Sequence, residues 1–143
     1  MIKFVYDDGG RSKYFKAENV GDCVCRAIAI GTGKDYKEVY DLLNKLSKEE
    51  KTSKRKRGTS NARNGVYRVT YDKLLKSLGW KWTPTMKIGE GCKIHLRADE
   101  LPAGVVICRL SKHLATVIDG ELHDTYDSSR DGSRCVYGYY TKA

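Results

Sequence analysis

The stretch HLATVIDGELHDTYD, residues 113–127, has the pattern of two β-strands joined by a tight turn. Asp119-Gly120 is a strong signal for a two-residue hairpin loop, because such loops favour residues that tolerate a positive φ. With this turn in place, Ile118 pairs with Glu121 and the alternation of side chains along both strands follows. The segment therefore predicts an antiparallel sheet in the last third of the chain.

One face of this hairpin carries a histidine and a carboxylate. Paired residues share a face, and so do residues two apart on a strand, so His113, Ala115, Asp124 and Tyr126 fall on the same face. Asp124 lies diagonally from His113, at a Cβ separation of about 7 Å. A carboxylate at that distance can fix the tautomer of the imidazole and stabilise its charged form. A solvated polar pair on an exposed face is the alternative interpretation.

The residues before the hairpin predict helices followed by further strands. Apolar residues at helical spacing predict one helix over residues 35–50 and another over about 69–78. Strands are expected at residues 2–6, 80–84, 105–110 and 135–140, and residues 13–16 could return as another strand. Helices that precede a sheet favour the α+β class. A length of 143 residues with 40% hydrophobic residues fits one globular domain, residues 1–143.

The segment NVGDCVCRAIAI, residues 19–30, predicts a helix that begins with a cysteine. Asp22 can cap a helix from Cys23 to about Ile30. The unpaired N–H groups and the helix dipole at this end favour negative charge, which lowers the pKa of a thiol. Cys23 and Cys25 point about 200° apart on a helix, so only one can face a given cleft, and we favour Cys23. A shifted helix start would exchange their roles, and a pair of buried core cysteines is the alternative.

The net charge of +9 is concentrated in one segment. Residues 51–68 hold no acidic residue and seven basic ones: Lys51, Lys54, Arg55, Lys56, Arg57, Arg63 and Arg68. The composition of residues 51–65 predicts a basic, mobile surface loop. Through its charge this loop could bind nucleic acid or an acidic host protein, with Lys54, Arg55, Lys56 and Arg57 as the contacts.

The cysteines and the apolar runs indicate the compartment. Five cysteines without framework spacing favour free thiols. No apolar run approaches about 18 residues and the first residues lack the pattern of a secretory signal, so we expect a cytoplasmic protein with no membrane partner. Cys92 and His95 form a CxxH pair, but no second compact pair has zinc-finger spacing, so neither a metal site nor a cofactor is expected.

These residues resemble the papain-like cysteine peptidase superfamily. There, a cysteine begins the first long helix, a histidine opens a late strand, and an Asn or Asp follows on the neighbouring strand. Cys23, His113 and Asp124 occur in this order. The chain also resembles small uncharacterised bacteriophage-associated proteins through its DCVCRAIA, HLATVIDGELHDTYD and RCVYGYY segments, which would imply the cytoplasm of a host cell.

The resemblance implies a papain-like domain in which N-terminal helices pack on a C-terminal antiparallel sheet. Cys23 would attack a carbonyl of a protein or peptide-like substrate, His113 would move the proton, and Asp124 would orient His113. Papain-like enzymes place a glutamine shortly before the cysteine to bind the oxyanion. This chain has no glutamine, and Asn19 could supply a side-chain amide instead.

Three functions are open at this point. The first is a cysteine-dependent hydrolase of the peptidase, isopeptidase or amidase type. The second is a non-catalytic binding module of similar fold that uses the basic loop to hold nucleic acid or an acidic protein. The third is an inhibitor of a host enzyme.

Overall fold

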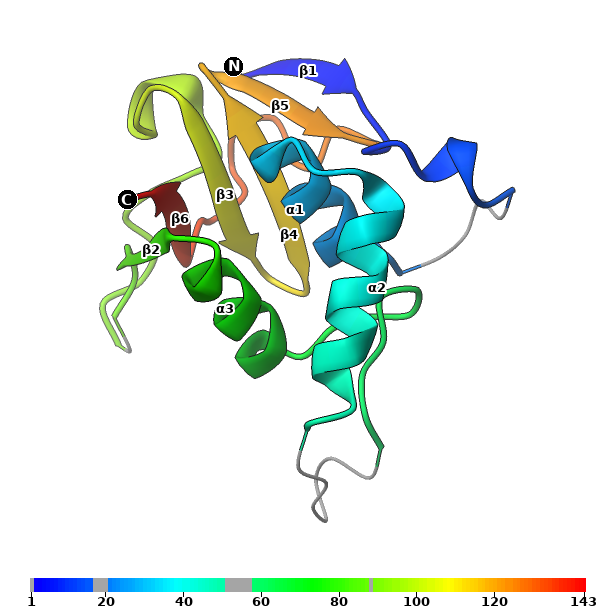
Figure 1. Cartoon of the computed structure of the whole chain (residues 1–143). Coiled ribbons are helices and arrows are strands. Elements are labelled where there is room, and N and C mark those ends of the chain that lie inside the picture. Colours follow the sequence, from blue (N-terminus) through cyan, green and yellow to red (C-terminus); the bar gives the residue numbers. More distant parts are fainter. Residues whose placement is uncertain (1, 17–20, 51–57, 88) are drawn as a thin grey trace.

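The computed structural model describes residues 2–16, 21–50, 58–87 and 89–143, and within these ranges three α-helices accompany a six-stranded sheet (Figure 1). The helices are α1 (Cys23–Thr32), α2 (Tyr36–Ser47) and α3 (Arg68–Ser77). The strands are β1 (Lys3–Tyr6), β2 (Trp80–Pro84), β3 (Val105–Leu110), β4 (His113–Ile118), β5 (Glu121–Asp124) and β6 (Gly138–Lys142). The predicted α+β class is confirmed.

The strands follow the order β1-β5-β4-β3-β6-β2 across the sheet. The hairpin of β4 and β5 has the predicted register, with Ile118 opposite Glu121. The antiparallel pairing expected in the last third of the chain is confirmed for β3, β4, β5 and β6, whereas β1 runs parallel to β5 and makes the whole sheet mixed. This pairing joins strands more than 110 residues apart in the chain, and no local pattern specifies the direction of such a contact.

Helix α1 lies across one face of the sheet and packs mainly on β4 (Figure 1). Thr116 on β4 donates a hydrogen bond from its hydroxyl to the Ala27 carbonyl of α1 over 2.6 Å. Gly31 permits the close approach of α1 to β3, since a Cβ there would meet Ile107 at 2.7 Å. Helix α2 buries Val39 and Leu43, which lie at helical spacing, against this layer. The start of α1 is thereby fixed relative to β4.

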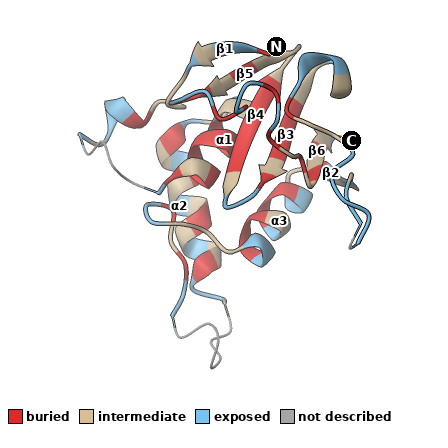
Figure 2. Cartoon of the chain, turned by 180° about the vertical axis from the view of Figure 1, so that it is seen from behind, coloured by how far each residue is buried: buried red, intermediate tan, exposed pale blue. Residues whose placement is uncertain are grey.

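The opposite face of the sheet is covered by irregular chain rather than by helices (Figure 2). Leu96 and Val136 are fully buried there against Val106, Val117 and Leu122. The chain therefore has a second small core behind the sheet, which anchors the strand that carries His113 from both sides.

Four local expectations are corrected. Residues 13–16 do not form a strand, because a 3-10 helix spans Arg11–Lys13. Strand β5 ends at Asp124, and β6 begins at Gly138, later than expected. The expectation of free thiols fails for Cys92 and Cys135, which form a disulfide. Their spacing of 43 residues is the product of the fold and has no signature in the sequence.

The structure describes only part of the expected basic loop. Residues 51–57, including Lys54, Arg55, Lys56 and Arg57, lie outside the described residues. Residues 58–65 are tied to the core, since Ala62 is fully buried and its N–H donates to the Asn44 side chain over 2.9 Å. Glu50 holds the base of this segment by accepting hydrogen bonds from Ser60 and Thr70. None of the described helices is long and apolar enough to cross a membrane.

Candidate active site

Cys23 is the first residue of α1 and is half-buried. The first intrahelical bond runs from the Arg26 N–H to the Asp22 carbonyl, so the N–H groups of residues 23–25 point out of the helix end. Asp22 occupies the N-cap position, but its side chain does not cap the helix as expected. It accepts bonds from Arg11 (3.1 Å), Tyr36 (2.7 Å) and Arg26 instead. A buried carboxylate with cationic donors available binds them in preference to a backbone N–H.

His113 and Asp124 meet at the start of the hairpin. The Nε2 atom of His113 lies 2.7 Å from a carboxylate oxygen of Asp124, and both side chains are less than a tenth exposed. The Thr125 N–H at 2.7 Å and the Ser128 hydroxyl at 2.9 Å also donate hydrogen bonds to the Asp124 carboxylate. The Tyr126 ring lies 5.4 Å from the imidazole ring, centroid to centroid. The diagonal contact across the hairpin thus has the geometry that the register predicts.

His113 interacts with the Cys23 thiol strongly enough to shift the pKa of that thiol, and both residues line one cleft. Because Asp124 engages Nε2, Nδ1 is the ring nitrogen left for the sulfur. Burial by itself raises the pKa of the Cys23 thiol. The bond to His113, the charge of His113, a backbone N–H of Leu114 and the charge of Arg26 together outweigh burial and lower that pKa below its ordinary value.

The pKa of His113 shifts in the direction opposite to that of Cys23. Burial disfavours the charged form of His113, but the bonds to Asp124 and Cys23 dominate and raise its pKa to about 9. Burial also raises the pKa of Asp124, and the bond to and charge of His113 reverse this and lower it. These opposite shifts favour a thiolate–imidazolium pair backed by an ionised carboxylate. A thiolate in this state is the nucleophilic form of cysteine.

Arg26 is a component of the site that sequence reasoning missed. Its side chain is 7% exposed and bridges two carboxylates, those of Asp22 and Asp124, the latter over 3.4 Å. A buried arginine between two acids neutralises charge that would otherwise be stranded in a low-dielectric interior. Its position one turn after Cys23 in the DCVCR motif is the signal that could have indicated it.

The remaining thiols are unsuited to nucleophilic chemistry. Cys25 is fully buried and donates from its sulfur to the Tyr36 carbonyl over 3.7 Å. Burial, with the charge of Asp22, raises the pKa of Cys25 to about 12, and burial alone raises that of Cys108 to about 12. Of the two helix cysteines, Cys23 is the one that meets the histidine.

Cys23 and His113 lie on the wall of an open cleft of about 330 Å³. The cleft is bounded by the start of α1, the start of α3, the turn between β3 and β4, and residues 64–66. Gly21 approaches this last segment closely, since a Cβ there would meet the Asn64 carbonyl oxygen at 2.9 Å. The thiol is thus accessible to a substrate from one side and backed by protein on the other.

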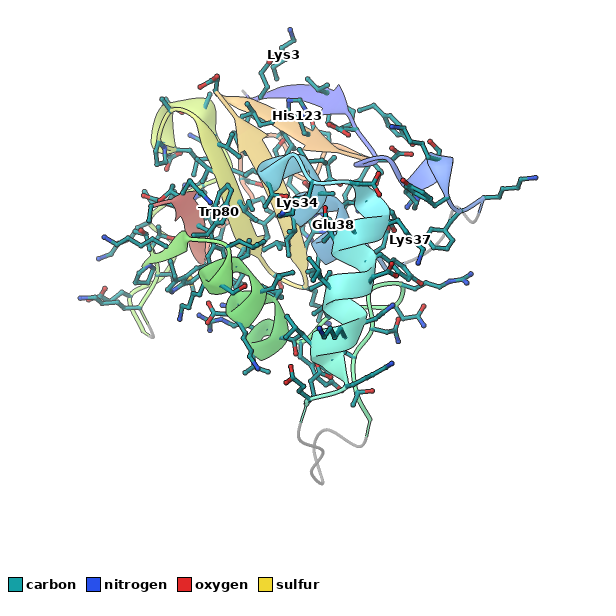
Figure 3. All side chains as sticks on the ribbon, viewed as in Figure 1. Lys3, Lys34, Lys37, Glu38, Trp80 and His123 are labelled. Atoms are coloured by element: carbon teal, nitrogen blue, oxygen red, sulfur yellow. A yellow bond between two sulfur atoms is a disulfide. The ribbon has the colours of Figure 1, made fainter. Side chains whose placement is uncertain are left out.

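A larger hollow of about 490 Å³ lies at the opposite end of α1, beside Lys34 and Trp80 (Figure 3). Its lining contains no thiol, histidine or carboxylate. It therefore offers no nucleophile or base, and the smaller cleft is the better candidate for chemistry.

Two other expectations concern the oxyanion and a metal ion. Asn19, expected to bind the oxyanion, lies outside the described residues. Among the described residues, no group of three or more His, Cys, Asp or Glu side chains is arranged to hold a metal ion. Cys92 of the CxxH pair is committed to its disulfide, while His95 contacts Glu100 over 3.2 Å.

The site therefore combines an activated thiol, a base and a carboxylate that holds the base, at the mouth of a cleft. No protein-family model, curated protein or solved structure matches the chain.

Proposed function

We propose that this protein is a papain-like cysteine hydrolase that cleaves an amide, isopeptide or thioester bond. The observation that carries the proposal is that Cys23 and His113 line one open cleft and shift each other's pKa, while Asp124 holds the His113 ring over 2.7 Å. The position of Cys23 at a helix start and the chain order of the three residues, which resembles the papain-like superfamily, support it further.

The first half of the reaction transfers the acyl group to the enzyme. The Cys23 thiolate attacks the carbonyl carbon, and the C=O electron pair moves to oxygen to give a tetrahedral oxyanion. As this intermediate collapses, the protonated His113 donates its proton to the leaving nitrogen or sulfur, and the bond to that atom breaks. A thioester on Cys23 and a neutral His113 result.

The second half regenerates the thiolate. Neutral His113 removes a proton from a water molecule, which attacks the thioester carbonyl and forms a second oxyanion. Collapse expels the Cys23 sulfur as thiolate, releases the carboxylic acid, and leaves the proton on His113. Asp124 holds the ring in one orientation throughout and stabilises its charged form, which it does without itself taking the proton.

The oxyanion needs hydrogen-bond donors. The N–H of Cys23 belongs to the helix end, where the N–H groups have no intrahelical partner and the dipole favours negative charge. One such donor is worth about 10²–10³ in kcat when it is aligned with the developing charge.

Acylation by p-nitrophenyl acetate tests this proposal. Wild type should release a burst of nitrophenol equal to the enzyme concentration, gain one acetyl group on Cys23 by mass spectrometry, and then turn over. Cys23→Ala should show neither the burst nor the acetyl group. His113→Gln should acylate more slowly and retain the acetyl group, because no base activates water.

The matched control is Cys25→Ala, which removes the buried neighbour on the same helix. It should acylate and turn over at a rate similar to that of wild type. Equal turnover by wild type and Cys23→Ala would refute the hydrolase proposal, as would an acetyl group that accumulates on Cys23 of wild type and never leaves.

A further inference from the structure

The cleft that holds Cys23 is lined by cations from three different elements. Arg68 begins α3, Arg109 lies near the end of β3, and Lys112 lies in the turn between β3 and β4. In Figure 1 the β3–β4 turn and the first turn of α3 lie toward the same end of the molecule. None of the described residues that line the cleft is acidic. A concave surface of one charge sign concentrates ligands of the opposite sign.

Aromatic rings hold the two guanidinium groups in place. The Arg68 guanidinium lies 5.0 Å from the centre of the Trp82 ring, and that of Arg109 lies 5.6 Å from the centre of the Tyr137 ring. Burial raises the pKa of Tyr71, which lines the same cleft, and the nearby charge of Arg109 opposes this rise. Restrained guanidinium groups lose little freedom on binding and can engage a carboxylate with two parallel bonds.

The charge of these three cations is not taken up by ion pairs within the described part of the chain. Within the described residues, Arg68, Arg109 and Lys112 form no ion pair with a carboxylate. Asp72, which lies one turn after Arg68, is already bound to Lys76 at 2.9 Å and to the Tyr140 hydroxyl at 2.7 Å. Asp124 is committed to His113 and Arg26 behind the site. The positive charge of the cleft is therefore available to a ligand.

Lys112 adds an independent indication. It has a φ of 54°, in the left-handed region where a side chain costs about 1–2 kcal/mol relative to glycine. It is exposed and gains no stabilising burial at this position. A lysine at a strained turn position that lines the cleft of the nucleophile is explained most simply by an interaction of its charge with a ligand.

We propose that the substrate of this site carries a carboxylate, which the three cations bind beside the reacting thiol. The carboxylate is supplied either by an acidic side chain next to the scissile bond or by a free C-terminus close to it. This inference rests on the proposed hydrolase function and specifies the substrate class. It also explains why the cations of the cleft, unlike Arg26, form no ion pair with a carboxylate of the described residues.

Alkylation of Cys23 tests the inference without a known substrate. Iodoacetate and iodoacetamide form the same bond to the thiolate, but only iodoacetate is negatively charged. The rate constant of iodoacetate on Cys23 is divided by that of iodoacetamide, and this ratio is divided by the same ratio measured on glutathione. The normalised ratio measures the preference of the cleft for an anion. At low salt we expect this normalised ratio to be about 10 in wild type and to fall toward 1 in about 1 M salt, where the Debye length is about 3 Å.

Variants assign the effect to the cleft. Arg68→Gln, Arg109→Gln and Lys112→Gln combined should bring the normalised ratio near 1, and each alone should lower it about twofold, because the three charges share the effect. The control Lys34→Gln removes a similar charge beside the hollow at the other end of α1 and should leave the ratio unchanged.

The outcomes separate this inference from the proposed function. Slow reaction of Cys23 with both reagents would overturn the activated nucleophile itself. Rapid reaction with iodoacetamide at a normalised ratio of 1, or a ratio that the triple variant retains, would overturn only the carboxylate inference. The kcat/KM values of three peptide thioesters, one with an adjacent glutamate, one with a free C-terminus and one with neither, then distinguish the two sources of the carboxylate. Equal kcat/KM values for all three would also overturn the carboxylate inference.

Discussion

Replacement of Arg26 by glutamine should destabilise the fold far more than loss of an exposed ion pair. The Arg26 guanidinium is 7% exposed and serves two carboxylates, those of Asp22 and Asp124, which are 0% and 3% exposed. Two unit charges 4 Å apart attract by about 4 kcal/mol at an effective dielectric constant of about 20. Removal of one partner from a buried pair costs about 3–5 kcal/mol, because the other charge stays buried.

Urea unfolding followed by the fluorescence of Trp80 and Trp82 measures this loss. We expect Arg26→Gln to lose about 3–5 kcal/mol of unfolding free energy and, at about 4 °C per kcal/mol, about 12–20 °C in Tm. Lys37→Gln is the control. It removes an exposed i,i+4 pair with Asp41 at 2.6 Å and should cost less than about 0.5 kcal/mol.

A second variant isolates the cause of the loss. Asp22→Asn added to Arg26→Gln removes the charge of one of the two carboxylates that Arg26 serves, the one that Arg11 also contacts, and keeps a side chain of the same shape. It should restore at least about 1 kcal/mol relative to Arg26→Gln alone. A loss below about 1 kcal/mol in Arg26→Gln, or no recovery in the double variant, would refute the role given to this arginine.

Two further perturbations follow from the same structure. The raised pKa of His113, about 9 against about 6.5 in an unfolded chain, stabilises the fold fully below pH 6.5 and is lost as the pH rises through 9. A Cys23→Ala background removes the opposite contribution of the thiolate and its share in the His113 shift, while Asp124 still raises the pKa of His113. In that background His113→Gln should therefore flatten the fall in unfolding free energy above pH 6.5, and an unchanged slope would contradict the raised pKa. Reduction of the Cys92–Cys135 disulfide, which closes 43 residues, should cost about 2–4 kcal/mol in urea unfolding, and a Cys92→Ser/Cys135→Ser variant should be insensitive to reductant. Equal stability of oxidised and reduced wild type would show that this bond does not constrain the chain.

Local patterns predicted the elements that carry the chemistry. The Asp119-Gly120 turn determines the register of β4 and β5, and that register places Asp124 beside His113. The start of α1 at Cys23, directly after Asp22, agrees with the start predicted from the sequence. Each of these features depends on contacts between residues close in the chain, which the period of the side chains reveals.

The unpredicted features depend on contacts between distant segments. The parallel pairing of β1 with β5, the Cys92–Cys135 disulfide and the bridge from Arg26 to Asp124 each join parts of the chain more than 40 residues apart. Local propensity does not determine which distant segments meet. The Asp22 side chain likewise does not cap α1 as expected. In the folded chain it accepts hydrogen bonds from Arg11, Arg26 and Tyr36 instead.

The ionisation of Cys23 is the most direct test of the proposed chemistry. The ultraviolet absorbance of the thiolate, taken as the difference between wild type and Cys23→Ser, gives the apparent pKa of this one sulfur as the pH is varied. We predict a value below the 8.5 or so of a free cysteine in wild type, and a value above it in His113→Gln, where burial acts unopposed by the imidazolium. A wild-type value at or above about 8.5, or the same value in both proteins, would contradict an ion pair between Cys23 and His113.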